Sequence, residues 1–190
     1  MPHHENPEEQ IESGYFRKMK GVTKSPPMVS HSEIVWSWIG AFFGIAAVAA
    51  IHYHLLDETA FVMVIGSFGA SAVLLYGSPK SPFAQPRNLV GGHITSALIG
   101  VACYQLFSPT MWLAASLAVA TSIVAMHATK TLHPPGGATA LIAVIGGAEI
   151  HELGYFYALV PAGAGAFIML LVALAVNNIP KTRSYPKFWV

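Results

Sequence analysis

The chain has 190 residues, of which 54% are apolar and only 10% are charged, and its formal net charge is +1. An ordinary soluble domain carries roughly 25% charged residues, so this chain has too few charges to cover an aqueous surface. The small net charge and the lack of a basic patch argue against a nucleic-acid partner. The composition therefore favours an all-α membrane protein whose main partner is the lipid bilayer.

The first part of the chain, residues 1–32, is polar and contains four prolines, Pro2, Pro7, Pro26 and Pro27. We expect a flexible cytoplasmic N-terminal tail here. A short amphipathic helix lying on the membrane over Ile11–Lys20 is the alternative. The sequence leaves both interpretations open.

Six apolar runs follow this tail and predict six membrane segments. A bilayer core of about 30 Å needs about 20 helical residues. Four runs approach or exceed that length, and two are short or interrupted. The sequence therefore predicts a transmembrane domain over 33–178 and a cytoplasmic C-terminal tail over 179–190, with four long runs at 34–51, 89–107, 112–128 and 155–176 and two short ones at 61–76 and 138–147.

The basic residues predict the orientation of these segments, because Lys and Arg concentrate in cytoplasmic loops. None of the ten lies inside a strongly apolar run. If the N-terminal tail is cytoplasmic and all six runs cross, every Lys and Arg falls on the cytoplasmic side. We therefore expect both termini in the cytoplasm, and we expect a bacterial inner (plasma) membrane. The ten residues are Arg17, Lys18, Lys20, Lys24, Lys80, Arg87, Lys130, Lys181, Arg183 and Lys187.

A short internal sequence similarity suggests that the two halves of the chain are related. Gly69-Ala70-Ser71-Ala72 resembles Gly137-Ala138-Thr139-Ala140, and each lies in a short run between two long ones. Three crossings per half would place the halves in opposite orientations, as in transporters with inverted repeats and broken helices. The sequence thus predicts a 3+3 inverted repeat. A chance match between two Gly- and Ala-rich stretches is the alternative.

The second short run begins with the stretch His133-Pro134-Pro135-Gly136-Gly137-Ala138-Thr139-Ala140. Two prolines end any helix arriving from Thr131. We expect a new helix to begin at Gly137, with Thr139 in its first turn. The free N–H groups at such a helix start carry partial positive charge and attract anions.

This stretch resembles the signature of the HPP family of integral membrane proteins. Gln85-Pro86-Arg87-Asn88, followed by Gly92-His93, resembles another segment of that family. The resemblance covers roughly residues 34–176. It implies a helical membrane fold. Plastid members of the family are linked to nitrite transport and bacterial members are mostly uncharacterised, so the resemblance implies a small anion, nitrite first, as substrate.

A small anion that leaves water needs hydrogen-bond donors and a positive field. Helix starts, hydroxyl groups and imidazoles near the two short runs would supply them, and Arg87 would steer or bind the anion. His133 would exchange a proton near neutral pH. Three alternatives stay open: Arg87 as a loop charge, His93 as a structural hydrogen bond and His133 as a cap. The predicted substrate-binding residues are Ser67, Gly69, Ser71, Arg87, Asn88, His93, His133, Gly137 and Thr139.

The sequence thus predicts a membrane transporter or channel for a small anion, with its site between two broken helices. The alternatives are a membrane-embedded binding or sensor protein without transport and an intramembrane enzyme that uses His133. No hydrolase, metalloprotease or P-loop motif is found, so we expect no enzyme. His52 and His54 are too few for a metal site, and we expect no cofactor. Gly- and Ala-rich helix faces would permit a homo-oligomer.

Overall fold

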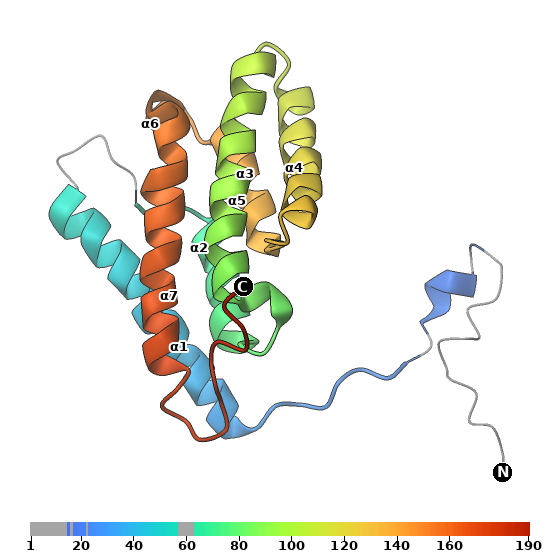
Figure 1. Cartoon of the computed structure of the whole chain (residues 1–190), viewed down its shortest axis with the longest axis vertical. Helices are drawn as coiled ribbons and strands as arrows, with labels where there is room; N and C mark the ends of the chain where they lie inside the picture. Colours follow the sequence, from blue (N-terminus) through green and yellow to red (C-terminus); the bar gives the residue numbers. More distant parts are fainter. Residues whose placement is uncertain (1–14, 16, 22, 57–62) are drawn as a thin grey trace. The chain divides into compact units, whose positions relative to one another are not determined.

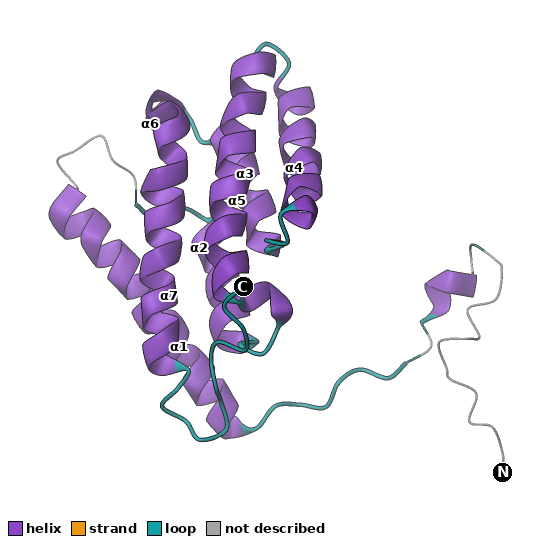
Figure 2. Ribbon diagram, viewed as in Figure 1, coloured by secondary structure: helices purple, strands orange, loops and turns teal. Residues whose placement is uncertain are grey.

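The computed structural model describes residue 15 and residues 17–21, 23–56 and 63–190, and all regular structure in this part of the chain is helical (Figure 2). The chain divides into two compact units, Met1–Ser30 and His31–Val190. Half of the expected flexible tail, and half of the amphipathic helix over Ile11–Lys20, lies outside the described residues. Within that stretch, Arg17–Lys20 forms a single 3₁₀ turn.

Four helices of the second unit are long and apolar enough to cross a membrane, namely His31–Leu55, Pro86–Phe107, Met111–Ala128 and Ala148–Val176. They contain α1 (His31–Ile51), α3 (Pro86–Phe107), α4 (Met111–Ala128), α6 (Ala148–Leu153) and α7 (Ala164–Val176) (Figure 1). The prediction of an all-α membrane protein with four long segments is confirmed.

The two other apolar helices are short, as predicted. α2 (Ser67–Ala72) continues into a π-helical turn, Val73–Gly77. α5 covers Pro134–Ile145. At 1.5 Å per residue each is only about 16–18 Å long, far less than a bilayer core.

The predicted start of the second short helix is wrong by three residues. α5 begins at Pro134, not at Gly137, so Thr139 lies in its second turn. Proline is compatible with the first positions of a helix, because its fixed φ suits a helix and an N–H there would have no partner within it. The two prolines therefore start α5. The first short helix, α2, begins at Ser67.

The helix α3 packs against both α4 and α5, while α1 packs against α7. Close approach to α5 depends on Gly100, because a Cβ atom there would lie 2.5 Å from the carbonyl oxygen of Ala140. Large side chains fill the space between the other helices, and Phe68, Tyr157 and Met169 are at most 1% exposed. These contacts fix both short helices against longer ones.

The long–short–long order of helices occurs twice along the chain, as the predicted repeat requires. The two short helices each lie between two long ones in sequence. Whether the halves are related by an inverted two-fold axis stays a prediction.

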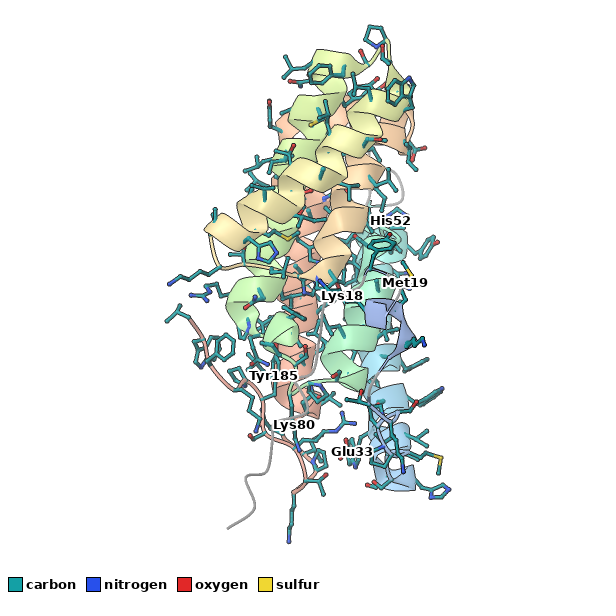
Figure 3. All side chains as sticks on the ribbon, turned by 90° about the vertical axis from the view of Figure 1, so that its right-hand side faces the viewer. Lys18, Met19, Glu33, His52, Lys80 and Tyr185 are labelled. Carbon is teal, nitrogen blue, oxygen red and sulfur yellow. The ribbon has the colours of Figure 1, made fainter. Side chains whose placement is uncertain are left out.

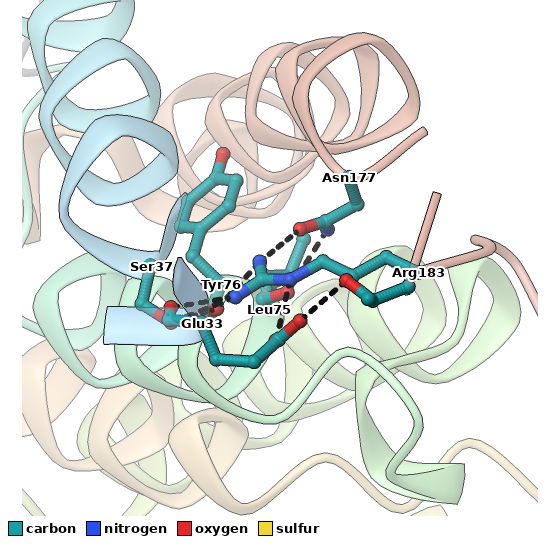
Figure 4. Close-up of polar contacts among 7 residues, drawn as sticks. Glu33, Ser37, Leu75, Tyr76, Asn177 and Arg183 are labelled. Carbon is teal, nitrogen blue, oxygen red and sulfur yellow. Dashed lines mark hydrogen bonds and ion pairs between the residues drawn. The ribbon is translucent and has the colours of Figure 1, made fainter. Parts of the chain in front are cut away.

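The C-terminal segment from Asn177 onward, which includes the predicted cytoplasmic tail over 179–190, packs against the helices of the second unit. Arg183 is only 6% exposed. Its Nε donates to a carboxylate oxygen of Glu33 at 2.8 Å, and its terminal nitrogens donate to Ser37, to the backbone of Glu33 and Tyr76, and to Asn177 (Figure 4). Arg183 thus joins the start of α1 to the end of the first short helix.

A second contact of this segment involves Tyr185, whose hydroxyl donates to the carbonyl of Ala84 at 2.7 Å. Burial raises the pKa of the Tyr185 phenol, so it stays protonated and remains a donor. Glu33, Lys80 and Tyr185 lie toward the same end of the second unit (Figure 3). The C-terminal segment therefore covers the end of the bundle where α1 begins.

Candidate functional site

Five polar side chains from three parts of the bundle meet in its interior. Ser67 and Ser71 come from α2, His93 from α3, Thr139 from α5 and His133 from the residue just before α5. Each is 0% exposed. All five belong to the substrate site predicted from the sequence, and we call them the buried polar network.

Hydrogen bonds connect these five side chains in an unbranched series. Ser71 Oγ lies 2.8 Å from Nε2 of His93 and 2.9 Å from Nε2 of His133. On its other side, His93 Nδ1 lies 2.7 Å from Oγ1 of Thr139. Thr139 Oγ1 in turn lies 2.9 Å from Oγ of Ser67. The order is therefore Ser67, Thr139, His93, Ser71, His133.

Local sequence explains why these groups meet. Ser67 and Ser71 are four residues apart, so they lie on one face of α2. His133 has extended backbone angles and directly precedes α5, as expected for a residue before proline. Close approach to α3 requires Gly92, because a Cβ atom there would lie 2.5 Å from Cβ of His133. Glycine on α3 thus makes room for the start of α5.

Three groups outside the prediction surround the buried polar network. Nδ1 of His133 lies 2.8 Å from the carbonyl oxygen of Phe83, and Tyr157 donates to the carbonyl of Thr139 at 3.1 Å. The ring of Phe68 packs edge-on against His93, with the ring centres 5.3 Å apart. A backbone carbonyl has no sequence signal. Tyr157 lies in a long apolar run, where nothing distinguishes it from an interfacial tyrosine.

The other four predicted site residues form no hydrogen bond with the buried polar network among the described residues. The side-chain amide of Asn88 donates to the carbonyl of Leu132 at 2.9 Å. The side-chain oxygen of Asn88 and the Nε atom of Arg87 are buried, and neither has a hydrogen-bond partner in the described part of the chain. Gly69 is exposed, and Gly137 is half-buried. Arg87 and Asn88 therefore belong to the start of α3.

The two helix starts supply fewer free N–H groups than the sequence interpretation assumed. At α5, Pro134 and Pro135 have no N–H, and the N–H of Gly136 donates to the carbonyl of His133 at 2.8 Å. At α2, the N–H groups of Phe68 and Gly69 donate to the preceding turn. The site therefore offers side-chain hydroxyls and imidazoles more than backbone donors.

A groove of about 520 Å³ lies between the two short helices, and none of the five residues of the buried polar network lines it. Ala70 and Ala138, which line it, are the direct sequence neighbours of Ser71 and Thr139. Most of its lining is small or apolar, and Ser78 is its one hydroxyl-bearing residue. The full lining is Ala70, Val73, Leu74, Gly77, Ser78, Pro134, Pro135 and Ala138.

Comparison with known proteins shows which protein family this chain is similar to. A family model described as "HPP, transmembrane region" matches residues 26–186. A transmembrane protein of Dictyostelium discoideum is 50% identical over 179 residues, which cover 92% of this chain and 57% of the relative. A second transmembrane protein of the same organism is 47% identical over 180 residues, covering 92% of this chain and 63% of the relative.

The chain therefore spans about three fifths of the length of these relatives. Both come from a eukaryote, so they lend no support to the expected bacterial membrane, which stays a prediction together with the orientation of the termini. No solved structure matches the chain significantly.

Proposed function

The chain belongs to the HPP transmembrane family, and we propose that it carries a small monovalent anion, nitrite first, across the membrane between its two short helices. It is an integral membrane protein in contact with lipid, as its family and its apolar helices indicate. Nitrite comes from the resemblance to plastid members linked to nitrite transport. A homo-oligomer is compatible with this function but is not required by it.

The observation that carries the proposal is the buried polar network itself. Polar groups are expensive inside a membrane and mark substrate or ion pathways more often than not. Here five of them connect two helices that are too short to span a bilayer core and that lie beside a groove. Transporters with broken helices have their substrate sites at such places.

The charge of the surrounding chain favours an anion over a cation. From Thr59 to Ala148 the sequence contains no Asp or Glu. Intramembrane carboxylates are the usual partners of transported cations. The network instead offers hydroxyl and imidazole N–H donors, which suit the oxygen atoms of an anion.

The start of α3 offers a further donor. Arg87 is at the second position of α3, and its Nε is buried without a hydrogen-bond partner in the described part of the chain. Leaving such a donor unpaired costs free energy. An arriving anion would satisfy it, so we assign Arg87 a role in attracting the substrate.

Uptake into liposomes tests the proposal. Purified protein in liposomes should admit nitrite faster than protein-free liposomes at the same pH, and excess unlabelled nitrite should compete with the label. Nitrate, formate and chloride as competitors would define the range of anions. Binding of nitrite without entry would instead favour the sensor alternative, and chemical conversion of nitrite would favour the enzyme.

A further inference from the structure

We propose that the five side chains of the buried polar network form a proton relay between Ser67 and His133. The inference rests on the proposed function, because a relay is useful here only where a proton accompanies a solute across the membrane. It adds a second transported species, the proton, and assigns a role to each of the five residues.

Every contact in the series joins groups that can both donate and accept a hydrogen bond. Serine and threonine hydroxyls do so, and a neutral imidazole has one donor nitrogen and one acceptor nitrogen. The four contacts measure 2.9, 2.7, 2.8 and 2.9 Å from Ser67 to His133. Each contact joins a hydroxyl or imidazole group directly to the next, so a proton can pass from each member to the next.

One end of the series has a fixed hydrogen position. The carbonyl of Phe83 is only an acceptor, so Nδ1 of His133 carries a hydrogen and donates to it. Nε2 of His133 is therefore the nitrogen that gains or loses a proton. His133 is therefore the last member of the series to receive the proton, and it must release that proton again for the crossing to be completed.

Two arrangements of hydrogens satisfy all of these contacts, and they differ by one proton. In the first, Thr139 donates to Ser67. Thr139 has no second hydrogen to donate, so His93 Nδ1 must donate to Thr139. Ser71 has one hydrogen for its two imidazole contacts, so Nε2 of either His93 or His133 must also carry a hydrogen. The series as a whole therefore holds one excess proton, on His93 or on His133. The second arrangement reverses the contact between Thr139 and Ser67: Ser67 donates to Thr139, Thr139 to His93, His93 to Ser71 and Ser71 to His133, and the series is neutral.

Transfer of one proton converts the neutral arrangement into the charged one. A proton binds to Oγ of Ser67, which releases its own hydrogen to Thr139. Thr139 passes its hydrogen to Nδ1 of His93, His93 passes the one on Nε2 to Ser71, and Ser71 passes its own to Nε2 of His133. Each hydroxyl ends with one hydrogen, His93 changes tautomer, and His133 becomes an imidazolium.

The transfer has a direction along the helices. Ser67 and Ser71 are one turn of α2 apart, about 6 Å along its axis, while His133 directly precedes α5 and Thr139 lies in its second turn. Ser67 contacts Thr139 at one end, and Ser71 contacts His133 at the other. The two short helices are therefore antiparallel here, and the proton moves along both axes.

Among the described residues, no carboxylate forms a hydrogen bond with the five side chains that could neutralise the excess proton. The described residues make three further hydrogen bonds to these groups. The carbonyls of Phe83 and Pro135 accept from His133 and Thr139. The hydroxyl of Tyr157, the titratable group that the α6–α7 segment directs toward Thr139, donates to the backbone carbonyl of Thr139. α2, α3 and α5 contribute the network groups themselves. A buried cation without a counter-ion is costly, and an anion in the groove between the two short helices would lower that cost. Proton and anion would therefore enter together.

Proton entry can be measured directly. Liposomes containing the protein and trapped pyranine, held at pH 7.5 and given an inward nitrite gradient, should acidify inside faster than protein-free liposomes. Ser71→Ala removes the central hydroxyl and should slow this acidification by about 10-fold or more. Ser71→Thr, which keeps a hydroxyl, should retain it.

Ser122→Ala is the matched control. Ser122 is also 0% exposed, but its hydroxyl bonds only to carbonyls of its own helix, α4, among the described residues. It should acidify at the wild-type rate. Nitrite entry without acidification in the wild type, or wild-type acidification by Ser71→Ala, would overturn the relay and leave nitrite transport standing.

A second measurement does not depend on nitrite. In ¹⁵N spectra of histidine-labelled protein, with His93→Gln and His133→Gln used for assignment, the neutral form should carry hydrogen on Nδ1 of His133 and on Nε2 of His93. Lowering the pH should change the protonation of both rings in one shared titration step. In Ser71→Ala the two rings should instead titrate in two separate steps. Three results would overturn the relay even if no nitrite is transported. They are the opposite tautomers, independent titration of the two rings in the wild type, and no change in either ring.

Discussion

Ser71 Oγ lies 2.9 Å from Nε2 of His133, a residue 62 positions further along the chain. This one contact joins the two helices that are too short to cross a bilayer, and both groups are fully buried. The buried polar network of the protein therefore lies at the junction of its two short helices.

The hydroxyl of Thr139 should contribute to stability as well as to transport. Thr139→Val keeps the shape of the side chain but leaves His93 Nδ1 and Ser67 without their partner. We expect a loss of about 1–3 kcal/mol in the free energy of unfolding, measured by thermal unfolding in detergent. Thr139→Ser should restore most of it. A valine variant as stable as the wild type would show that the network adds nothing to folding.

Arg183 should hold the C-terminal segment onto the bundle. Its side chain is 1% exposed and that of its partner Glu33 is 28% exposed, so solvent screens part of the ion pair. Arg183→Gln removes the pair and several hydrogen bonds, and we expect a loss of about 2 kcal/mol. Lys181→Gln, at an exposed position four residues after Asn177, is the control. Equal melting temperatures for the two variants would contradict this role.

Two glycines should respond in opposite ways to alanine. At Gly100 the new Cβ would lie 2.5 Å from the backbone oxygen of Ala140, so Gly100→Ala should push α5 away from α3 and cost about 1–3 kcal/mol. At Gly69 nothing lies within 4 Å. Gly69→Ala should be neutral or stabilise the helix by up to about 1 kcal/mol. If Gly69→Ala instead abolishes nitrite uptake while the protein stays folded, Gly69 belongs to the binding site after all.

Arg87 should matter most when nitrite is scarce. Arg87→Gln removes a positive charge at the start of α3, and we expect uptake at low nitrite to fall roughly 3- to 10-fold, with a smaller effect at saturation. Arg87→Lys keeps the charge and should lose less. The dependence of initial uptake rate on nitrite concentration checks this. A drop that is equal at all concentrations would show that Arg87 does not act by attracting the anion.

The sequence predicted the fold well because membrane segments follow from apolar length and from the distribution of charge. It also identified five residues that meet, because Ser67, Ser71, His93, His133 and Thr139 are polar groups inside or beside short apolar runs. Such groups must face one another or a cavity. Their order in the network could not be predicted, since it depends on how closely α5 approaches α3.

Other features of the site were beyond the sequence for clear physical reasons. The carbonyl of Phe83 is a backbone group, and every residue has one. The role of Arg183 depends on a chain reversal that returns the C-terminal segment to α1. The start of α5 was misplaced because Pro134 and Pro135 were interpreted as the end of a helix, whereas a double proline fits the first turn equally well.

The most direct test of a transport site between the short helices is the initial rate of nitrite uptake by His93→Gln in liposomes. His127→Gln is the matched control, because His127 lies in the last turn of α4 and is exposed. We predict that His93→Gln is at least about 10-fold slower than the wild type and that His127→Gln is unchanged. Uptake by His93→Gln at the wild-type rate, with the protein folded, would contradict the account.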